Sequence, residues 1–168
     1  MKTIAILCSL FLVLAGQNIH AQGYIANLDG AQDGGGGRTG TGQVMMYLTG
    51  TTLSFSNGLY SGLSGTVTSA HIHGPAGIGA TAGVIFDLVP TFITTGANNG
   101  TIAAGNVALS AGNAANLANG LLYINIHSTT FGGGEIRGQI LPIPEPASAA
   151  LLLIGVACLA IRSSRKTL

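Results

Sequence analysis

Residues 43–63 read QVMMYLTGTTLSFSNGLYSGL, three short apolar stretches separated by turn residues. The stretches are Gln43–Leu48, Thr51–Phe55 and Leu59–Leu63. Each is only five or six residues long and carries Tyr, Phe, Thr or Val, which favours a strand over a helix. Thr49-Gly50 and Asn57-Gly58 stand between them, and such residues tolerate the positive φ of tight turns. The segment therefore predicts consecutive β-strands.

The same alternation of short apolar stretches and turn residues continues on both sides of this segment. Further candidate strands are Tyr24–Asp29, Val67–His73, Gly83–Val89, Val107–Leu109, Leu121–His127 and Glu135–Leu141. Asn99-Gly100 and Asn119-Gly120 are two more turn dipeptides, and Ala111–Ala118 is expected to form one or two helical turns. Many short strands separated by turn signals are typical of an all-β sandwich or barrel. We therefore predict a single all-β domain.

The N-terminus reads as a secretory signal peptide. Lys2 precedes an apolar run at residues 4–15, whose length suits a signal peptide and falls short of the roughly 20 residues of a membrane span. Ile19-His20-Ala21 places an aliphatic residue at −3 and a small residue at −1, so we predict cleavage between Ala21 and Gln22. Residues 1–21 are thus expected to direct the domain to the secretion machinery.

Residues 142–168 predict a membrane and sorting tail with three parts in order. They are a proline-rich break at 142–146, an uncharged apolar helix at 147–161, and a basic end with Arg162, Arg165 and Lys166. Basic residues after an apolar helix stay in the cytoplasm, so the preceding domain is expected to face outward. Fifteen helical residues span about 22 Å, less than a hydrocarbon core of about 30 Å, which predicts a weak or temporary anchor.

This tail resembles the PEP-CTERM sorting signal of Gram-negative bacteria, whose tripeptide corresponds to Pro144, Glu145 and Pro146. The resemblance implies recognition by an exosortase-type membrane protease. It also implies transient anchoring in the inner membrane, followed by a place at the cell surface or outside the cell. Two alternatives fit less well. A lipid-anchor signal ends in an apolar tail, and a sortase signal needs a Leu-Pro-x-Thr-Gly motif, which this sequence lacks.

The domain between the two ends carries few charges and no cysteine. Two positive residues against four negative ones give a net charge of −2; they are Arg38, Arg137, Asp29, Asp33, Asp87 and Glu135. Without a lysine or a basic patch to neutralise phosphates, nucleic-acid binding is not expected. Cys8 and Cys158 lie in the end segments, which excludes a disulfide, a thiol nucleophile and a thiolate metal site within the domain.

Three histidines lie in the domain: His71, His73 and His127. His71 and His73 flank Ile72 in a predicted strand, and alternate residues of a strand face the same side. His127 ends another predicted strand, so three imidazoles converge if the two strands are neighbours. Three neutral imidazoles suit copper or zinc. The alternative is that the histidines donate hydrogen bonds to loop carbonyls and close the barrel without a metal.

Two motifs in the domain resemble the CHRD domain, a family widespread in exported bacterial proteins. The first is Ala70-His71-Ile72-His73-Gly74-Pro75-Ala76 followed by Gly83–Leu88, and the second is Tyr123–His127 followed by Gly134–Ile140. The CHRD domain is in turn similar to Cu/Zn superoxide dismutase, a Greek-key β-barrel. The resemblance therefore implies a Greek-key barrel or sandwich for the domain, whose bounds we place at residues 22–141.

The likeness to Cu/Zn superoxide dismutase also implies roles for four residues. His71 and His73 resemble its His-x-His copper strand, His127 falls where a late copper ligand lies, and Arg137 is similar in position to its substrate-guiding arginine. The sequence departs from that enzyme in having no fourth histidine in the domain, no zinc loop and no structural disulfide. A dinuclear dismutase is therefore not expected, and we assign no catalytic residue.

Two functions remain open from the sequence. The leading prediction is a non-enzymatic exported module of the cell surface or matrix, which acts through structure or by binding a matrix polysaccharide or protein. The alternative is a mononuclear copper- or zinc-binding protein, in a redox-active role, that uses the three histidines. Glu135 and Arg137 are two residues apart on one predicted strand, so we expect them to pair as an exposed ion pair of under about 1 kcal/mol.

Overall fold

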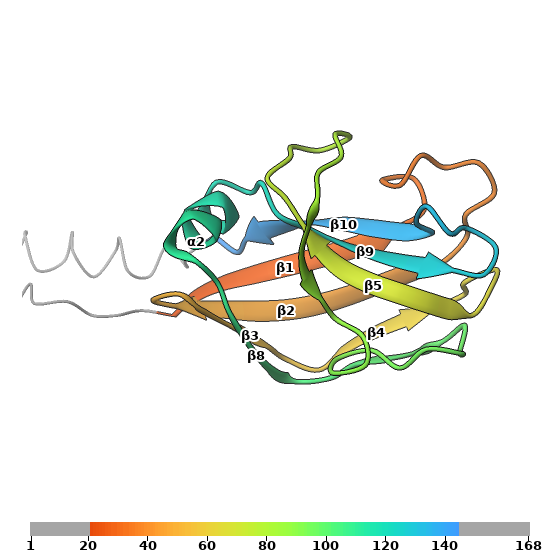
Figure 1. Cartoon of the computed structure of the whole chain (residues 1–168), viewed down its shortest axis with the longest axis horizontal. Helices are drawn as coiled ribbons and strands as arrows, with labels where there is room; N and C mark the ends of the chain where they lie inside the picture. The colour runs from red at the N-terminus through yellow and green to blue at the C-terminus, as the bar shows by residue number, and fades with distance from the viewer. Residues whose placement is uncertain (1–20, 145–168) are drawn as a thin grey trace, which may run out of the picture.

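The computed structural model describes residues 21–144, which form ten β-strands and one short helix (Figure 1). The strands are β1 (Gln22–Asp29), β2 (Thr41–Thr49), β3 (Thr52–Phe55), β4 (Gly58–Ser61), β5 (Val67–His73), β6 (Val84–Asp87), β7 (Gly100–Ile102), β8 (Gly105–Ala108), β9 (Tyr123–Ser128) and β10 (Ile136–Pro142). The helix is α2 (Ala111–Ala118). Nearly all of the predicted signal peptide and the apolar helix at 147–161 lie outside the described residues. No helix within residues 21–144 is long and apolar enough to cross a membrane.

The strands form one curled antiparallel sheet, a half-barrel, in the order β6-β5-β9-β10-β1-β2-β3-β8. Beyond this path, β4 pairs with β2 and with β7. Tyr24 of β1 lies opposite Pro142 of β10, so β1 begins and β10 ends at the same end of the sheet, beside α2 (Figure 1). The prediction of a single all-β domain is confirmed, and its form is one curled sheet.

The predicted bounds of most elements differ from the observed bounds by at most two or three residues. Val67–His73 and Ala111–Ala118 have the predicted bounds, and Ser110 caps the helix by accepting a 3.1 Å hydrogen bond from the backbone N–H of Asn113. The sequence analysis missed β7, because Gly100–Ile102 holds a single apolar side chain and so shows no periodicity. Its pairing with β4 comes from tertiary contact.

The apolar core is built from alternate residues of most strands, while β6 adds only partly buried side chains. On β5, β9 and β10 the inward side chains are fully buried; they are Ala70, Ile72, Ile124, Ile126, Ile136 and Ile140. Removing this apolar surface from water is the main force that holds the curled sheet together.

The opposite face of β5, β9 and β10 carries polar side chains that are nevertheless buried. Asn125, His127, Arg137 and Gln139 are each less than one-tenth exposed. Loop segments cover this face: Asp33 of the β1–β2 loop accepts a hydrogen bond from Asn125, and Ala76 of the β5–β6 loop accepts one from Gln139. We call this set the polar layer; it comprises His71, His73, Tyr123, Asn125, His127, Arg137 and Gln139.

Candidate metal centre

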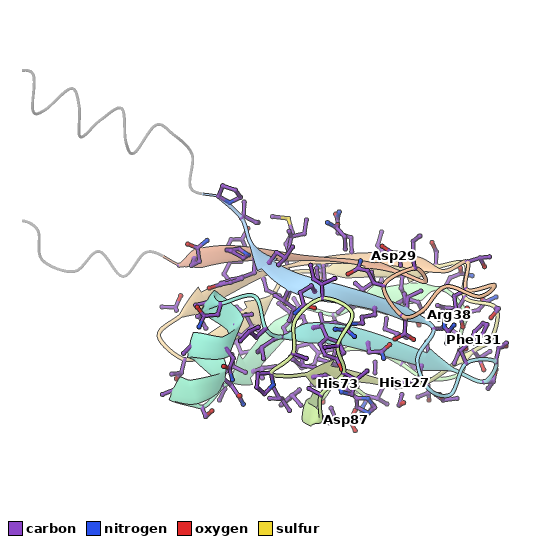
Figure 2. All side chains as sticks on the ribbon, turned by 90° about the horizontal axis from the view of Figure 1, so that it is seen from above. Asp29, Arg38, His73, Asp87, His127 and Phe131 are labelled. Carbon is purple, nitrogen blue, oxygen red and sulfur yellow. The ribbon has the colours of Figure 1, made fainter. Side chains whose placement is uncertain are left out.

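The pairing of β5 with β9 brings the three histidines together. Ser69 lies opposite His127, and His73 lies opposite Tyr123, so all three imidazoles project from the polar layer. The ring centroid of His71 is 5.3 Å from that of His73 and 5.0 Å from that of His127, and the third separation is 6.2 Å. One nitrogen from each ring lies within 4.8 Å of the other two. Figure 2 labels His73 and His127 on the same side of the domain, and the predicted convergence is confirmed.

Two of the imidazoles are oriented by backbone carbonyls. The Nδ1 atom of His73 lies 2.9 Å from the carbonyl oxygen of Ala82, and the Nδ1 atom of His127 lies 3.0 Å from that of Gly132. A carbonyl only accepts, so both Nδ1 atoms carry the proton and donate it. In each neutral ring Nε2 then holds a lone pair. His73 Nε2 is buried and has no hydrogen-bond partner among residues 21–144.

The third imidazole is hydrogen bonded directly to the second. His71 Nδ1 lies 3.1 Å from His127 Nε2. Because His127 Nε2 is an acceptor, His71 must donate from Nδ1, and this proton lies between the two rings. In the other tautomer of His71 the proton is on Nε2. Its Nδ1 then holds a lone pair that faces His127 Nε2.

Burial disfavours the charged form of two of these imidazoles. Desolvation lowers the pKa of His71, and the nearby His127 and His73 lower it further, while Asp87 opposes them. Desolvation also lowers the pKa of His73. The hydrogen bond to the carbonyl of Ala82 and the charge of Asp33 oppose this effect, while His127 and Arg137 add to it. Asp87 of β6 lies opposite His71 of β5. A metal ion requires the unprotonated form, and this environment favours it.

Sequence reasoning singled out Arg137 but missed Tyr123, Asn125 and Gln139 of the polar layer, as well as the loops that cover it. Asn125 Nδ2 donates to Asp33 Oδ1 at 3.3 Å, and Arg38 Nε lies 3.7 Å from Asp33 Oδ2. Burial raises the pKa of the Asp33 carboxyl, against the effect of Arg38. In the sequence Tyr123-Ile124-Asn125-Ile126-His127, a polar or aromatic residue at every second position is a signal for Asn125. Asp33 gives no such signal, since it reaches the site from a glycine-rich loop.

The ring of Tyr123 lies between Arg137 and His73. Its guanidinium carbon lies 3.5 Å from the centroid of the Tyr123 ring, and Tyr123 stacks on His73. The expected exposed pair with Glu135 is wrong, because Arg137 is 3% exposed and Glu135 is fully buried. The Glu135 carboxylate instead accepts hydrogen bonds from the backbone N–H and the hydroxyl of Ser64, at 2.5 and 2.8 Å.

The predicted processing positions lie at the margins of the described chain. Ala21 is exposed and Gln22 is the first residue of β1, so cleavage between them would leave that strand complete. Gln22 Nε2 also donates to the carbonyl oxygen of Ile143 at 3.0 Å. Pro144 is the last described residue, and Glu145 and Pro146 lie outside the described part.

The metal-free domain should lose stability as the pH falls below about 6.5, the usual pKa of histidine in an unfolded chain. The folded state lowers the pKa of His71 and His73, so below pH 6.5 the unfolded chain binds more protons and gains stability. Above pH 6.5 this loss of stability is absent. Below pH 6.5, each histidine lowers the free energy of unfolding by less than about 1.4 kcal/mol per pH unit.

Urea unfolding at pH 8, 6.5 and 5 measures this effect, with a variant that carries both His71→Asn and His73→Asn as the control. The native domain should unfold at lower urea as the pH falls, and the double variant should show a flatter dependence between pH 6.5 and 5. Equal slopes for the two proteins would contradict the assignment.

The family model of the CHRD domain matches residues 24–140. This range runs from β1 to β10 and contains every member of the polar layer. No curated protein and no solved structure matches the chain.

Proposed function

Because the chain belongs to the CHRD domain family, we propose that it is an exported extracellular β-module whose three-histidine site binds a copper or zinc ion. The observation that carries the proposal is the convergence of His71, His73 and His127 on one point of the polar layer. Two other features support it: two of the rings have fixed tautomers, and one ligand atom, His73 Nε2, is buried without a partner.

The spacing of the nitrogens is close to that of a metal site. Bonds of about 2.0–2.1 Å from zinc to imidazole allow two ligand nitrogens to lie at most about 4.2 Å apart. His71 Nδ1 and His127 Nε2, at 3.1 Å, already meet this limit, and one nitrogen of each of the three rings lies within 4.8 Å of the others. Binding one ion would bring the three nitrogens closer together than this.

The donor set argues for the class of ion. Three imidazole nitrogens without a thiolate or a carboxylate favour copper or zinc over calcium or magnesium, which prefer oxygen ligands. Three protein ligands also leave a coordination position open for water or a small molecule. The bound ion would supply Lewis acidity, or electron transfer if it is copper.

Proton and metal compete for the same atoms in this proposal. In the metal-free domain, the proton of His71 joins Nδ1 to His127 Nε2. Binding would move that proton to the other ring nitrogen of His71 and place the ion between the same two atoms. The hydrogen bonds of His73 to Ala82 and of His127 to Gly132 would remain, since they use the opposite ring nitrogens.

Binding of Cu²⁺ and Zn²⁺ to the purified mature chain tests the proposal. We expect saturable binding with one ion per chain at pH 7.5, and weaker binding below about pH 6 as the imidazoles protonate.

The second candidate function is a metal-free module that binds matrix polysaccharide or protein, and it is favoured by the direct hydrogen bond between His71 and His127. If neither Cu²⁺ nor Zn²⁺ binds saturably, the metal-free module would be the remaining candidate function.

We also propose that the domain is exported by its signal peptide and sorted by an exosortase-type protease that acts on the PEP-CTERM-like tail. The sequence supports this proposal, and the position of Gln22 at the start of β1 agrees with it. Mass spectrometry of the surface-resident protein should give an N-terminus at or near Gln22 and a chain that lacks residues 162–168. A surface form that retains Met1 or an intact C-terminus would contradict the proposal.

A further inference from the structure

A three-layer stack crosses the polar layer from β5 to β10. The rings of His73 and Tyr123 are 8° from parallel, with their centroids 5.0 Å apart. The Arg137 guanidinium carbon lies 3.5 Å from the centroid of the same Tyr123 ring. Since β9 lies between β5 and β10, His73 and Arg137 approach Tyr123 from the two strands that flank it. Stacked aromatic rings and a cation over a ring are both attractive arrangements.

Arg137 is a buried cation without a carboxylate partner. It is 3% exposed, and among residues 21–144 no carboxylate oxygen lies within 4.0 Å of its nitrogens. Its Nη2 donates to the carbonyl oxygen of Gly77 at 3.3 Å and to Gln139 Oε1 at 3.4 Å. The Tyr123 ring therefore adds a cation–π attraction to these two hydrogen bonds, and the same attraction helps to hold the ring in place.

The same residues hold the loop that orients His73. The backbone N–H of Ala82 donates to Tyr123 Oη at 3.0 Å, and the carbonyl oxygen of Ala82 accepts from His73 Nδ1. At the start of the loop, Gln139 Nε2 donates to the carbonyl oxygen of Ala76 at 2.8 Å. The ring plane of His73 is thus set by Tyr123, and the direction of its Nδ1–H bond is set by a loop that Tyr123 and Arg137 anchor.

We propose that Tyr123 and Arg137 are positioning residues that fix the imidazole of His73, so that its Nε2 points at the ion. This inference rests on the proposed function, since positioning has a use only if His73 is a ligand. Groups behind a metal ligand that set its tautomer and orientation change metal affinity about 10- to 100-fold when they are removed.

The test uses Tyr123→Leu, which removes the stack, and Tyr123→Phe, which keeps the ring and removes only the hydroxyl. In a second pair of variants, Arg137→Met removes the charge and Arg137→Lys keeps it. Tyr60→Leu is the matched control, because Tyr60 is 3% exposed but lies on β4, away from the polar layer. Each variant is measured for its Cu²⁺ dissociation constant, for the electron paramagnetic resonance spectrum of bound Cu²⁺, and for the ring ¹⁵N signals of His73 without metal.

We expect Tyr123→Leu to raise the dissociation constant about 10- to 100-fold and to change the copper spectrum. Its metal-free His73 should become a mixture of tautomers, whereas the native ring carries its proton on Nδ1. Tyr123→Phe keeps the stack but loses the hydrogen bond with Ala82, so it should lie between the native protein and Tyr123→Leu. Arg137→Lys should stay closer to the native protein than Arg137→Met, which should resemble Tyr123→Leu, and Tyr60→Leu should leave all three readouts unchanged.

The outcomes separate this inference from the proposed function. A native chain that binds neither Cu²⁺ nor Zn²⁺ overturns the proposed function, while the metal-free ¹⁵N signals still report on the stack. If Tyr123→Leu and Arg137→Met both leave the copper spectrum and the His73 tautomer unchanged, the positioning inference is wrong even though metal binds. If Tyr123→Leu does not fold, the Arg137 pair decides.

Discussion

Replacing His73 with alanine is expected to raise the dissociation constant for Cu²⁺ and Zn²⁺ by more than about 100-fold. The substitution removes one of three ligands, and removal of a group that merely supports a ligand already costs about 10- to 100-fold. His71→Ala and His127→Ala should have effects of the same size, because the three nitrogens converge on one point. Isothermal titration of each variant measures the change.

The fold should survive His71→Ala and His73→Ala, since these two residues are only partly buried and face away from the apolar core. Asn106→Ala is a matched control: Asn106 is an exposed polar residue of β8, an outer strand of the sheet, and its loss should leave metal binding unchanged. Native-like affinity in all three histidine variants would show that the ion binds elsewhere.

Replacing Gly138 with alanine should lower the free energy of unfolding by about 3 kcal/mol. Gly138 lies in β10, between β9 and β1, and an added Cβ would lie 2.5 Å from the carbonyl oxygen of Asn27. That oxygen belongs to the backbone of β1, a strand paired on both sides, so it has little room to move. The backbone of the central strands would have to shift instead.

Gly133→Ala provides the control for Gly138→Ala, because an added Cβ at Gly133 meets no atom within 4 Å and its backbone has no positive φ. Urea unfolding of the two variants should show a large loss for Gly138→Ala and little change for Gly133→Ala. Equal stability of the two variants would mean that β1 and β10 do not pack as closely as described.

The sequence predicted the strands well because most of them bury one face in a common core. In β5 the apolar residues Ala70 and Ile72 alternate with His71 and His73, which is the period-2 signal of a half-buried strand. The single curled sheet was harder to foresee. Its order depends on β10 pairing with β1, the first strand, and a contact between the two ends of the domain leaves no local pattern.

The candidate site was predictable where its residues come from regular strands. The spacing of His71 and His73 fixes their common face, and His127 at the end of a strand needed only the pairing of β5 with β9. The buried state of Arg137 and Glu135 was not predictable, because it depends on loops that fold back over the sheet. Asp33 and the carbonyl of Ala82 reach the polar layer from such loops. The path of a loop cannot be predicted from a periodic sequence pattern.

X-ray absorption spectroscopy of the mature chain loaded with one equivalent of Cu²⁺ is the sharpest test of the three-histidine site, because it reports the atoms bonded to the ion. We expect the multiple-scattering pattern of three imidazole rings, with nitrogens at about 2.0 Å. The pattern should fall to two rings in His73→Ala. A native spectrum with no imidazole pattern, or one that His73→Ala leaves unchanged, would show that the three histidines do not hold the ion.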